Sequence, residues 1–444
     1  ETVAKHLGLD WNEVRAKVED FHRRLGIVPR GGRYRYISPT PLGIHLAVEA
    51  WTTYPDLLRT LPNVLPSEGA KDAYYERLQS MASNPQAREY AREELSFFFR
   101  LADFVDERAV RRWAALAAAD PEQAARNILH ALEGASVADR ARIENGARRE
   151  TVWTLVRLAW RPGSFANAVK ALALLAEAEN ETWANNATAE FLGRFQLFLG
   201  GTALPYPDRL PVLDDLLGEN RPTLARLVVK ALGRIGERHP VRVGSAPASD
   251  ELPEKEWHPT TREEYLECFE AAFGRLSALA ECAKPELRDD LIAVAEEMSM
   301  VLRERPVRPL VVRLFDAVRA AYPDSREPLR RAIADIVHRE RKYWKEMSDE
   351  DLAEIDALHV RFEGASVGAR LRQDVGQLHS DRVDLPDLRP LARELLGSSA
   401  VLVQEWPWLT SGDAAEGWSL GEALAAEDSE KTLADTVSSL PDTG

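Results

Sequence analysis

The sequence predicts an all-α protein with one small β-hairpin wing, namely a winged helix-turn-helix followed by a HEAT-like α-solenoid. Three observations support this fold class. Apolar residues recur with helical spacing almost to the end of the chain. Glycine and proline residues divide that pattern into segments of about 10 to 18 residues. The one strand-like stretch surrounds Gly31-Gly32, a pair that suits a two-residue hairpin turn.

Composition and charge exclude several types of protein. The chain has 444 residues, of which 45% are hydrophobic, so it can bury a sizeable core and is not largely disordered. A formal net charge of −15 argues against wholesale nucleic-acid binding. The only cysteines are Cys268 and Cys282, which excludes a disulfide scaffold and fits a reducing, cytoplasmic location. No run of 18 apolar residues and no signal peptide is found, so we expect no membrane partner.

Residues 1–52 give the order of a winged helix. Asp10 is a suitable N-cap, Glu13 follows three residues later, and Gly26 ends the helix. Its apolar residues at helical spacing are Trp11, Val14, Val18, Phe21 and Leu25. A hairpin over 27–37 and a helix over 42–51 follow. The first helix of a winged helix would precede Glu1, so we expect this chain to be a fragment of a longer protein.

The winged helix is also the most basic part of the chain. Between Lys5 and Tyr36 there are eight Lys/Arg and four acidic residues, a net charge of +4. The candidate interaction residues are Arg15, Arg23, Arg24, Arg30, Arg33 and Arg35. They could contact DNA phosphates, or the same surface could pack on an adjacent domain. Acidic residues on the second helix would repel phosphate, so packing is favoured over nucleic acid.

Residues 53–362 are predicted to form the HEAT-like array. One of several apolar stripes at i, i+3, i+4 and i+7 spacing consists of Leu224, Leu227, Val228, Ala231, Leu232 and Ile235. Such helices bury their stripes by stacking in antiparallel pairs. No fixed-period repeat stands out, so a compact irregular helical domain is the alternative. Residues 243–260 are predicted to be a long loop within the array.

The end of the chain is predicted to be a separate piece. Residues 363–387 are Gly-rich and polar, and predict a hinge to a C-terminal helical piece, so that this domain spans 363–426. Residues 427–444 form an acidic tail. Trp406 and Trp408 flank a proline and are candidate protein contacts, whereas the other tryptophans are expected in the core.

Signatures of catalysis are absent from the sequence. There is no phosphate-binding G-x-x-x-x-G-K-[ST], no G-x-S-x-G, no H-E-x-x-H and no cysteine and histidine set with zinc spacing. We therefore predict that this chain is not an enzyme and holds no metal and no catalytic residue. The most distinctive string is AENETWANNATAEF at 178–191, whose Asn and Thr side chains are expected to fasten a corner between helices.

Four strings resemble one known family. They are RYRYISPTPLGIHLAVEAW (33–51), AENETWANNATAEF, VGARLRQDVGQLHSDRV (367–383) and WLTSGDAAEGWSLGEALAAED (408–428). They resemble the C-terminal half of bacterial STAND NTPases, the Avs-like ATPases of anti-phage defence. The resemblance implies an upstream NTPase module with ATP or ADP and Mg, against which the winged helix packs. It also implies a helical array that recognises a protein ligand, and homo-oligomers of the full-length protein.

The resemblance suggests one nucleotide contact in this chain. A winged-helix histidine helps to hold ADP in related STAND proteins, and His45 is the candidate here, although no Met-His-Asp string accompanies it. The predicted function is the regulatory and sensor region of such a signalling NTPase. The alternatives are a DNA-binding winged-helix transcriptional regulator with a helical ligand or dimerisation domain, a plain helical scaffold, and a hydrolase with an unrecognised site.

Overall fold

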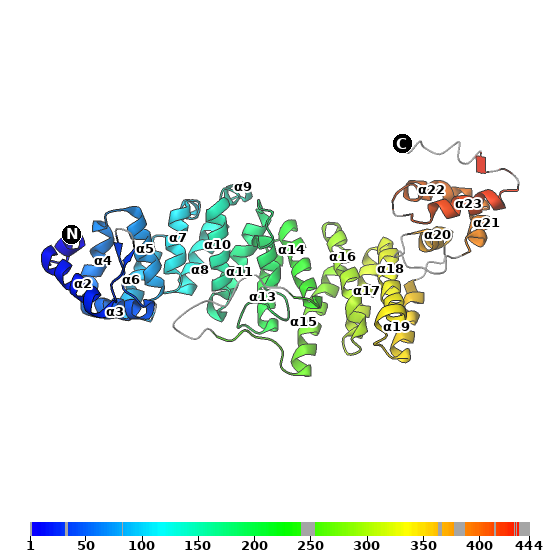
Figure 1. Cartoon of the computed structure of the whole chain (residues 1–444). Helices are drawn as coiled ribbons and strands as arrows, with labels where there is room; N and C mark the ends of the chain where they lie inside the picture. Colours follow the sequence, from blue (N-terminus) through cyan, green and yellow to red (C-terminus); the bar gives the residue numbers. More distant parts are fainter. Residues whose placement is uncertain are drawn as a thin grey trace. The chain divides into compact units, whose positions relative to one another are not determined.

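The computed structural model describes residues 2–31, 34–81, 83–240, 254–362, 366–376, 387–412, 414–429, 431 and 433–434. Within these residues the protein is helical apart from two short strands and connecting loops, which confirms the all-α prediction (Figure 1). The contacts within the chain divide it into two compact units, residues 1–260 and 261–444. That division falls inside the range predicted to be one continuous array.

Unit 1 contains fourteen labelled α-helices in its described part. Their bounds, with those of the two strands, are α1 (Thr2–His6), α2 (Trp11–Leu25), β1 (Arg30–Gly31), β2 (Tyr34–Arg35), α3 (Thr40–Thr53), α4 (Pro55–Thr60), α5 (Glu68–Gln79), α6 (Pro85–Leu95), α7 (Glu107–Leu116), α8 (Pro121–Glu133), α9 (Val137–Arg140), α10 (Asn145–Leu158), α11 (Pro162–Glu177), α12 (Ala187–Gly193), α13 (Tyr206–Gly218) and α14 (Pro222–Gly233). Short 3₁₀ turns lie at Leu61–Val64, Leu101–Phe104 and Arg234–Gly236.

Unit 2 begins with α15 (Arg262–Glu281). Its further elements are α16 (Arg288–Met298), α17 (Arg308–Ala321), α18 (Arg326–Arg339), the π-helical turn η7 (Glu340–Trp344), α19 (Asp349–Phe362), α20 (Val367–Val375), α21 (Arg389–Leu396), α22 (Ser399–Leu409) and α23 (Gly417–Glu427). Short 3₁₀ turns lie at Pro285–Leu287, Ser299–Arg303 and Pro323–Ser325.

The first helices start and stop where the sequence indicates. The Asp10 carboxylate accepts a hydrogen bond from the Glu13 amide at 3.0 Å, and Gly26 closes α2 in the left-handed conformation with φ of 69°. The hairpin is much smaller than predicted. β1 and β2 pair antiparallel over two residues each, with Arg30 opposite Arg35, so no developed wing is seen. Tyr36 and Ile37, which were expected in the second strand, are exposed coil.

Successive helices of unit 1 stack on one another. Helix α7 contacts α5 and α10, while α8 contacts α6 and α11, and Figure 1 shows these helices side by side. The apolar stripe predicted for α14 is buried, because Leu224, Val228 and Leu232 are fully enclosed. Helix α8 begins at Pro121 after the Asp120 cap and ends before Gly134, which fits the usual places of Asp, Pro and Gly at helix ends.

Buried arginines join the helices of unit 1. The last carbonyl groups of a helix have no partner within that helix and need donors from elsewhere. Arg148 donates to the carbonyls of Ile143 and Leu175, at 3.3 and 2.7 Å. Arg209 donates to the carbonyls of Arg194 and Gln196, at 3.1 and 3.0 Å. Each guanidinium thereby bonds to loop or helix-end carbonyls of the segments packed around it.

The C-terminal helices of unit 2 have a core of their own. Its buried residues lie on α20 to α23 and in the loop before α21, and include Leu371, Val375, Leu388, Leu391, Ala392, Leu395, Leu402, Leu420 and Leu424. The predicted hinge over 363–387 is wrong in part, since Val367–Val375 is helical and Ser366 caps it by accepting from the Ala369 amide. The rest of that hinge and most of the tail lie outside the described residues. Among the described helices, none has the length and apolar character required to cross a bilayer.

Candidate functional site

The basic residues of α2 lie on the surface. Arg15, Arg23 and Arg24 are exposed, and Arg24 pairs with Asp20 at 3.3 Å. Arg30 and Arg35 lie in β1 and β2, where only the backbone is described, and Arg33 lies outside the described residues. The structure therefore places three of the six predicted arginines on one exposed helix.

The apolar stripe of α2 is only partly covered. Trp11, Val14, Val18, Phe21 and Leu25 share one face of this helix at helical spacing, and none of them is buried. Trp11, Phe21 and Leu25 are 42%, 49% and 61% exposed, whereas Val14 and Val18 are half-buried. The exposed apolar residues of this stripe mark an interaction surface.

His45 lies on α3 with its side chain 69% exposed. Glu49 is one helical turn away, with Nε2 and Oε1 3.9 Å apart. Neither described pocket is lined by His45. The contact with ADP that the resemblance suggests for this residue stays a prediction, because it depends on a module outside this chain.

The exposure of the C-terminal tryptophans differs from the prediction. Trp406 and Trp408 are both half-buried on α22, with Pro407 between them inside the helix. Trp408 packs against the C-terminal core, and the Arg372 guanidinium lies 5.5 Å from its ring centre. Trp418, which was expected in the core, is 82% exposed on α23. This residue is the better contact candidate of the three.

The Asn- and Thr-rich string fastens a corner, as predicted. The Glu179 carboxylate accepts from Arg148 at 3.1 Å and from the amide and hydroxyl of Thr188 at 2.9 and 3.1 Å. Asn180 donates to the carbonyls of Ala141 and Ile143, and Asn186 caps α12. The string therefore joins α9, α10, α11 and α12, which is a structural role.

Two tryptophans and an arginine form a surface cluster beside this corner. The Arg149 guanidinium lies 4.8 Å from the ring centre of Trp183 and 6.0 Å from that of Trp153. Trp153 was expected in the core but is exposed on α10. Tryptophan and arginine are the residue types that contribute most to protein interfaces, so this cluster is a second contact candidate.

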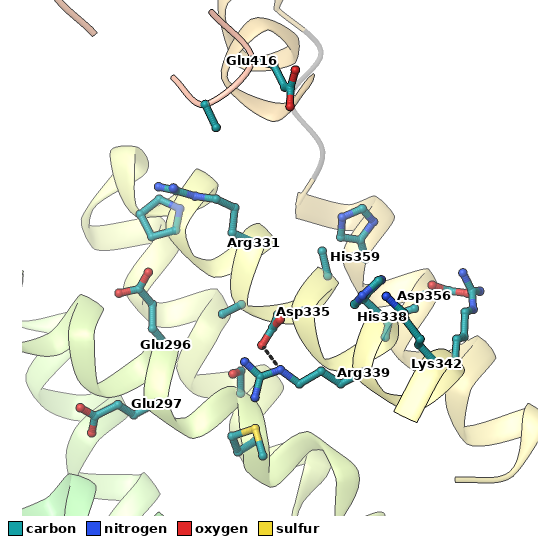
Figure 2. Close-up of a pocket in the computed structure, with 18 residues that line it drawn as sticks. Glu296, Glu297, Arg331, Asp335, His338, Arg339, Lys342, Asp356, His359 and Glu416 are labelled. Carbon is teal, nitrogen blue, oxygen red and sulfur yellow. Dashed lines mark hydrogen bonds and ion pairs between the residues drawn. The ribbon is translucent and has the colours of Figure 1, made fainter. Parts of the chain in front are cut away.

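A pocket of about 1420 Å³ lies in unit 2. One face of α18 forms its floor, the end of α16 forms one wall and α19 forms the other (Figure 2). Figure 2 shows Glu296 and Glu297 on one side, and His338, Lys342 and His359 on the other. Apolar lining comes from Met300, Pro328, Ala332 and Val337, and Ala415 and Glu416 complete it. Sequence reasoning missed this pocket because its residues come from separate helices.

Cations in the pocket are mostly paired with carboxylates. Arg339 pairs with Asp335 at 2.8 Å, and Arg341 pairs with Asp356 across to α19. Burial raises the pKa of Glu296 above its ordinary value, and the nearby Arg331 partly offsets that effect. The pocket is thus a polar, open groove with charges of both signs.

Other reactive groups do not converge. Within the described ranges, no three His, Cys, Asp or Glu side chains are arranged to hold a metal ion. Cys268 is buried and Cys282 is exposed. Comparison of the chain with protein-family models, with curated proteins and with solved structures gives no match.

Proposed function

We propose that this chain is the regulatory and sensor region of a STAND-type signalling NTPase of anti-phage defence. In this proposal α1 to α3 are the part of a winged helix that packs on an NTPase module, and the stacked helices form a HEAT-like array that recognises a protein ligand. The module would bind ATP or ADP with Mg. No step of nucleotide chemistry is assigned to this chain.

One observation carries the proposal, namely the three exposed apolar residues of the α2 stripe. Exposing Trp11, Phe21 and Leu25 to water is unfavourable by about 25 cal/mol for each Å² of apolar surface. Contact with a partner domain removes that cost. The basic residues Arg15 and Arg24, which are exposed on the same helix, favour a partner surface that is apolar with an acidic rim.

Regulation follows if the α2 contact exists in only one state of the NTPase. A ligand on the array can shift the protein towards an active assembly only when it binds the two states with different affinity. The contact made by α2 would be the element that differs between those states. The chain itself would carry recognition and coupling, and the chemistry would reside in the other module.

The first test is the complete reading frame. We expect it to encode G-x-x-x-x-G-K-[ST] ahead of this chain. In the full-length protein, Phe21→Asp with Leu25→Asp should change the rate of ATP hydrolysis about fivefold or more, a difference of about 1 kcal/mol. Neither side chain is buried, so the fold of this chain should persist.

The matched control is Phe97→Asp with Phe99→Asp, which changes two exposed aromatic residues of unit 1 by the same charge. The control should leave the hydrolysis rate within about twofold, because exposed substitutions away from a contact change little. A reading frame without a nucleotide-binding module would contradict the proposal. Salt-dependent binding to duplex DNA that is lost in Arg15→Ala with Arg23→Ala would instead favour a transcriptional regulator.

A further inference from the structure

The pocket of unit 2 is an elongated groove along one helix face. Pro328, Arg331, Asp335, His338 and Lys342 line it and recur every three or four residues. Fourteen residue steps at the rise of a helix span about 20 Å. An extended peptide of about six residues has the same length. The shape therefore suits a stretch of polypeptide better than a compact metabolite.

The charges of the groove favour a basic peptide. Two of its arginines, Arg339 and Arg341, are already neutralised by Asp335 and Asp356. By contrast, no ion pair joins Glu296 or Glu297 to a cation among the described residues, and Glu297 is exposed. The chain as a whole carries a formal net charge of −15, which raises the local concentration of cationic ligands.

A further feature suits the same ligand. Met300 and Ala332 are half-buried lining residues that can cover the aliphatic part of a lysine or arginine side chain.

We propose that this groove binds an extended peptide segment of the protein ligand that carries lysine or arginine, with its basic side chains against Glu296 and Glu297. This inference rests on the proposed function and deepens it, since it assigns the site and the chemistry of recognition. In this proposal, α16 and α18 are the elements that contact the ligand.

The test uses the whole chain and defined probes. Fluorescein-labelled peptides of alternating sequence, (Ala-Lys)₃, (Ala-Gln)₃ and (Ala-Glu)₃, are titrated and followed by fluorescence anisotropy at low ionic strength. We expect (Ala-Lys)₃ to bind more tightly than the other two. Hydrogen exchange should slow at amides of α18 when (Ala-Lys)₃ is added, which places the peptide in the groove.

Variants then distinguish binding of the peptide in the groove from its general electrostatic attraction to an acidic protein. Glu296→Gln with Glu297→Gln should raise the Kd for (Ala-Lys)₃ about tenfold, because two charge-assisted contacts are lost. The matched control is Glu267→Gln with Glu270→Gln, which removes the same charge from exposed positions of α15 and should change Kd less than about twofold. Glu297→Gln alone provides a milder variant if the pair perturbs folding.

Several results would overturn the inference. They are equal weakening by the two variant pairs, tighter binding of (Ala-Glu)₃, or no binding of (Ala-Lys)₃ to the unaltered chain. The outcome is distinguishable from failure of the proposed function, since the titration needs neither a nucleotide nor an NTPase module. Conversely, loss of the groove proposal would leave the reading frame and the α2 variants as a valid test of the regulatory role.

Discussion

At the scale of single residues, buried arginines stabilise the fold only while their carboxylate partners are present. The Arg148 side chain is fully buried, and Glu179 supplies the counter-charge at 3.1 Å. The same carboxylate also accepts both hydrogen bonds from Thr188. Removing one partner of a buried pair leaves an uncompensated charge, which costs more than the pair contributes when intact.

Glu179→Ala should therefore lower the free energy of unfolding of unit 1 by about 3–5 kcal/mol. Urea denaturation followed by circular dichroism measures this change. Glu133→Ala is the control, because Glu133 is an exposed carboxylate in the last turn of α8 and should alter stability by less than about 0.5 kcal/mol. Equal effects of the two substitutions would show that Glu179 is not the centre of the corner.

A second residue-scale prediction concerns Glu296. Burial raises the pKa of this carboxyl above 4.5, and Glu297 adds to the shift while Arg331 opposes it. A carboxyl whose pKa is raised by folding stabilises the protein below its unfolded pKa, and that contribution is lost as the pH rises through the folded value. The stability of the unaltered chain relative to Glu296→Gln should accordingly decrease between pH 4.5 and pH 7.

Urea denaturation of both proteins at the two pH values measures that difference. Glu267→Gln serves as the reference, since Glu267 is exposed on α15. The reference substitution should show no comparable change with pH. An unaltered chain that becomes more stable relative to Glu296→Gln as the pH rises would contradict the assigned direction of the pKa shift.

At the scale of elements, the sequence predicts where helices begin but not what covers them. Asp10, Gly26 and the Asp120-Pro121 pair mark helix ends that the structure reproduces. These signals are local, because a cap bonds to backbone groups within its own turn. The partial exposure of the α2 stripe and the exposure of Trp418 are not local properties. Periodicity identifies an apolar face, but the presence of a neighbour depends on tertiary packing.

Helix α20 is a case in which local sequence signals predicted the wrong structure. Its glycine and polar residues predicted a hinge, yet Gly368 lies inside the helix. A Cβ at Gly368 would approach the Glu405 carboxylate to 3.2 Å, so this glycine permits close packing against α22. The pocket could likewise not be predicted, since α16 and α19 contribute residues far apart in the sequence. Only the spacing of Arg331, Asp335, Arg339 and Lys342 on one face signalled it.

The element-scale prediction follows from the lack of burial in α2. Because no residue of α2 is buried, the helix depends on its caps and on helical propensity. Asp10→Ala removes the bond to the Glu13 amide and should cost about 1 kcal/mol locally. Hydrogen exchange of α2 amides should accelerate about fivefold, while the global unfolding transition stays in place. An unchanged exchange rate would indicate that some other contact holds α2.

At the scale of the whole molecule, the two units should unfold separately. Each has a core of its own: Leu172 is fully buried in unit 1, and Leu314 is fully buried in unit 2. Stacked helices couple mainly to their nearest neighbours, so a defect in one unit should remain in that unit. The groove of unit 2 could then bind its ligand without depending on the stability of unit 1.

Calorimetry of paired core variants tests this independence. Leu172→Ala should remove about 2–5 kcal/mol and lower the Tm of one transition by about 5 °C or more, leaving the other in place. Leu314→Ala should do the reverse, so that each substitution serves as the control for the other. A single transition that shifts equally in both variants would mean that the units fold as one. Recognition by the groove and docking by α2 would then be coupled through the fold itself, since any ligand that stabilised one unit would stabilise the other.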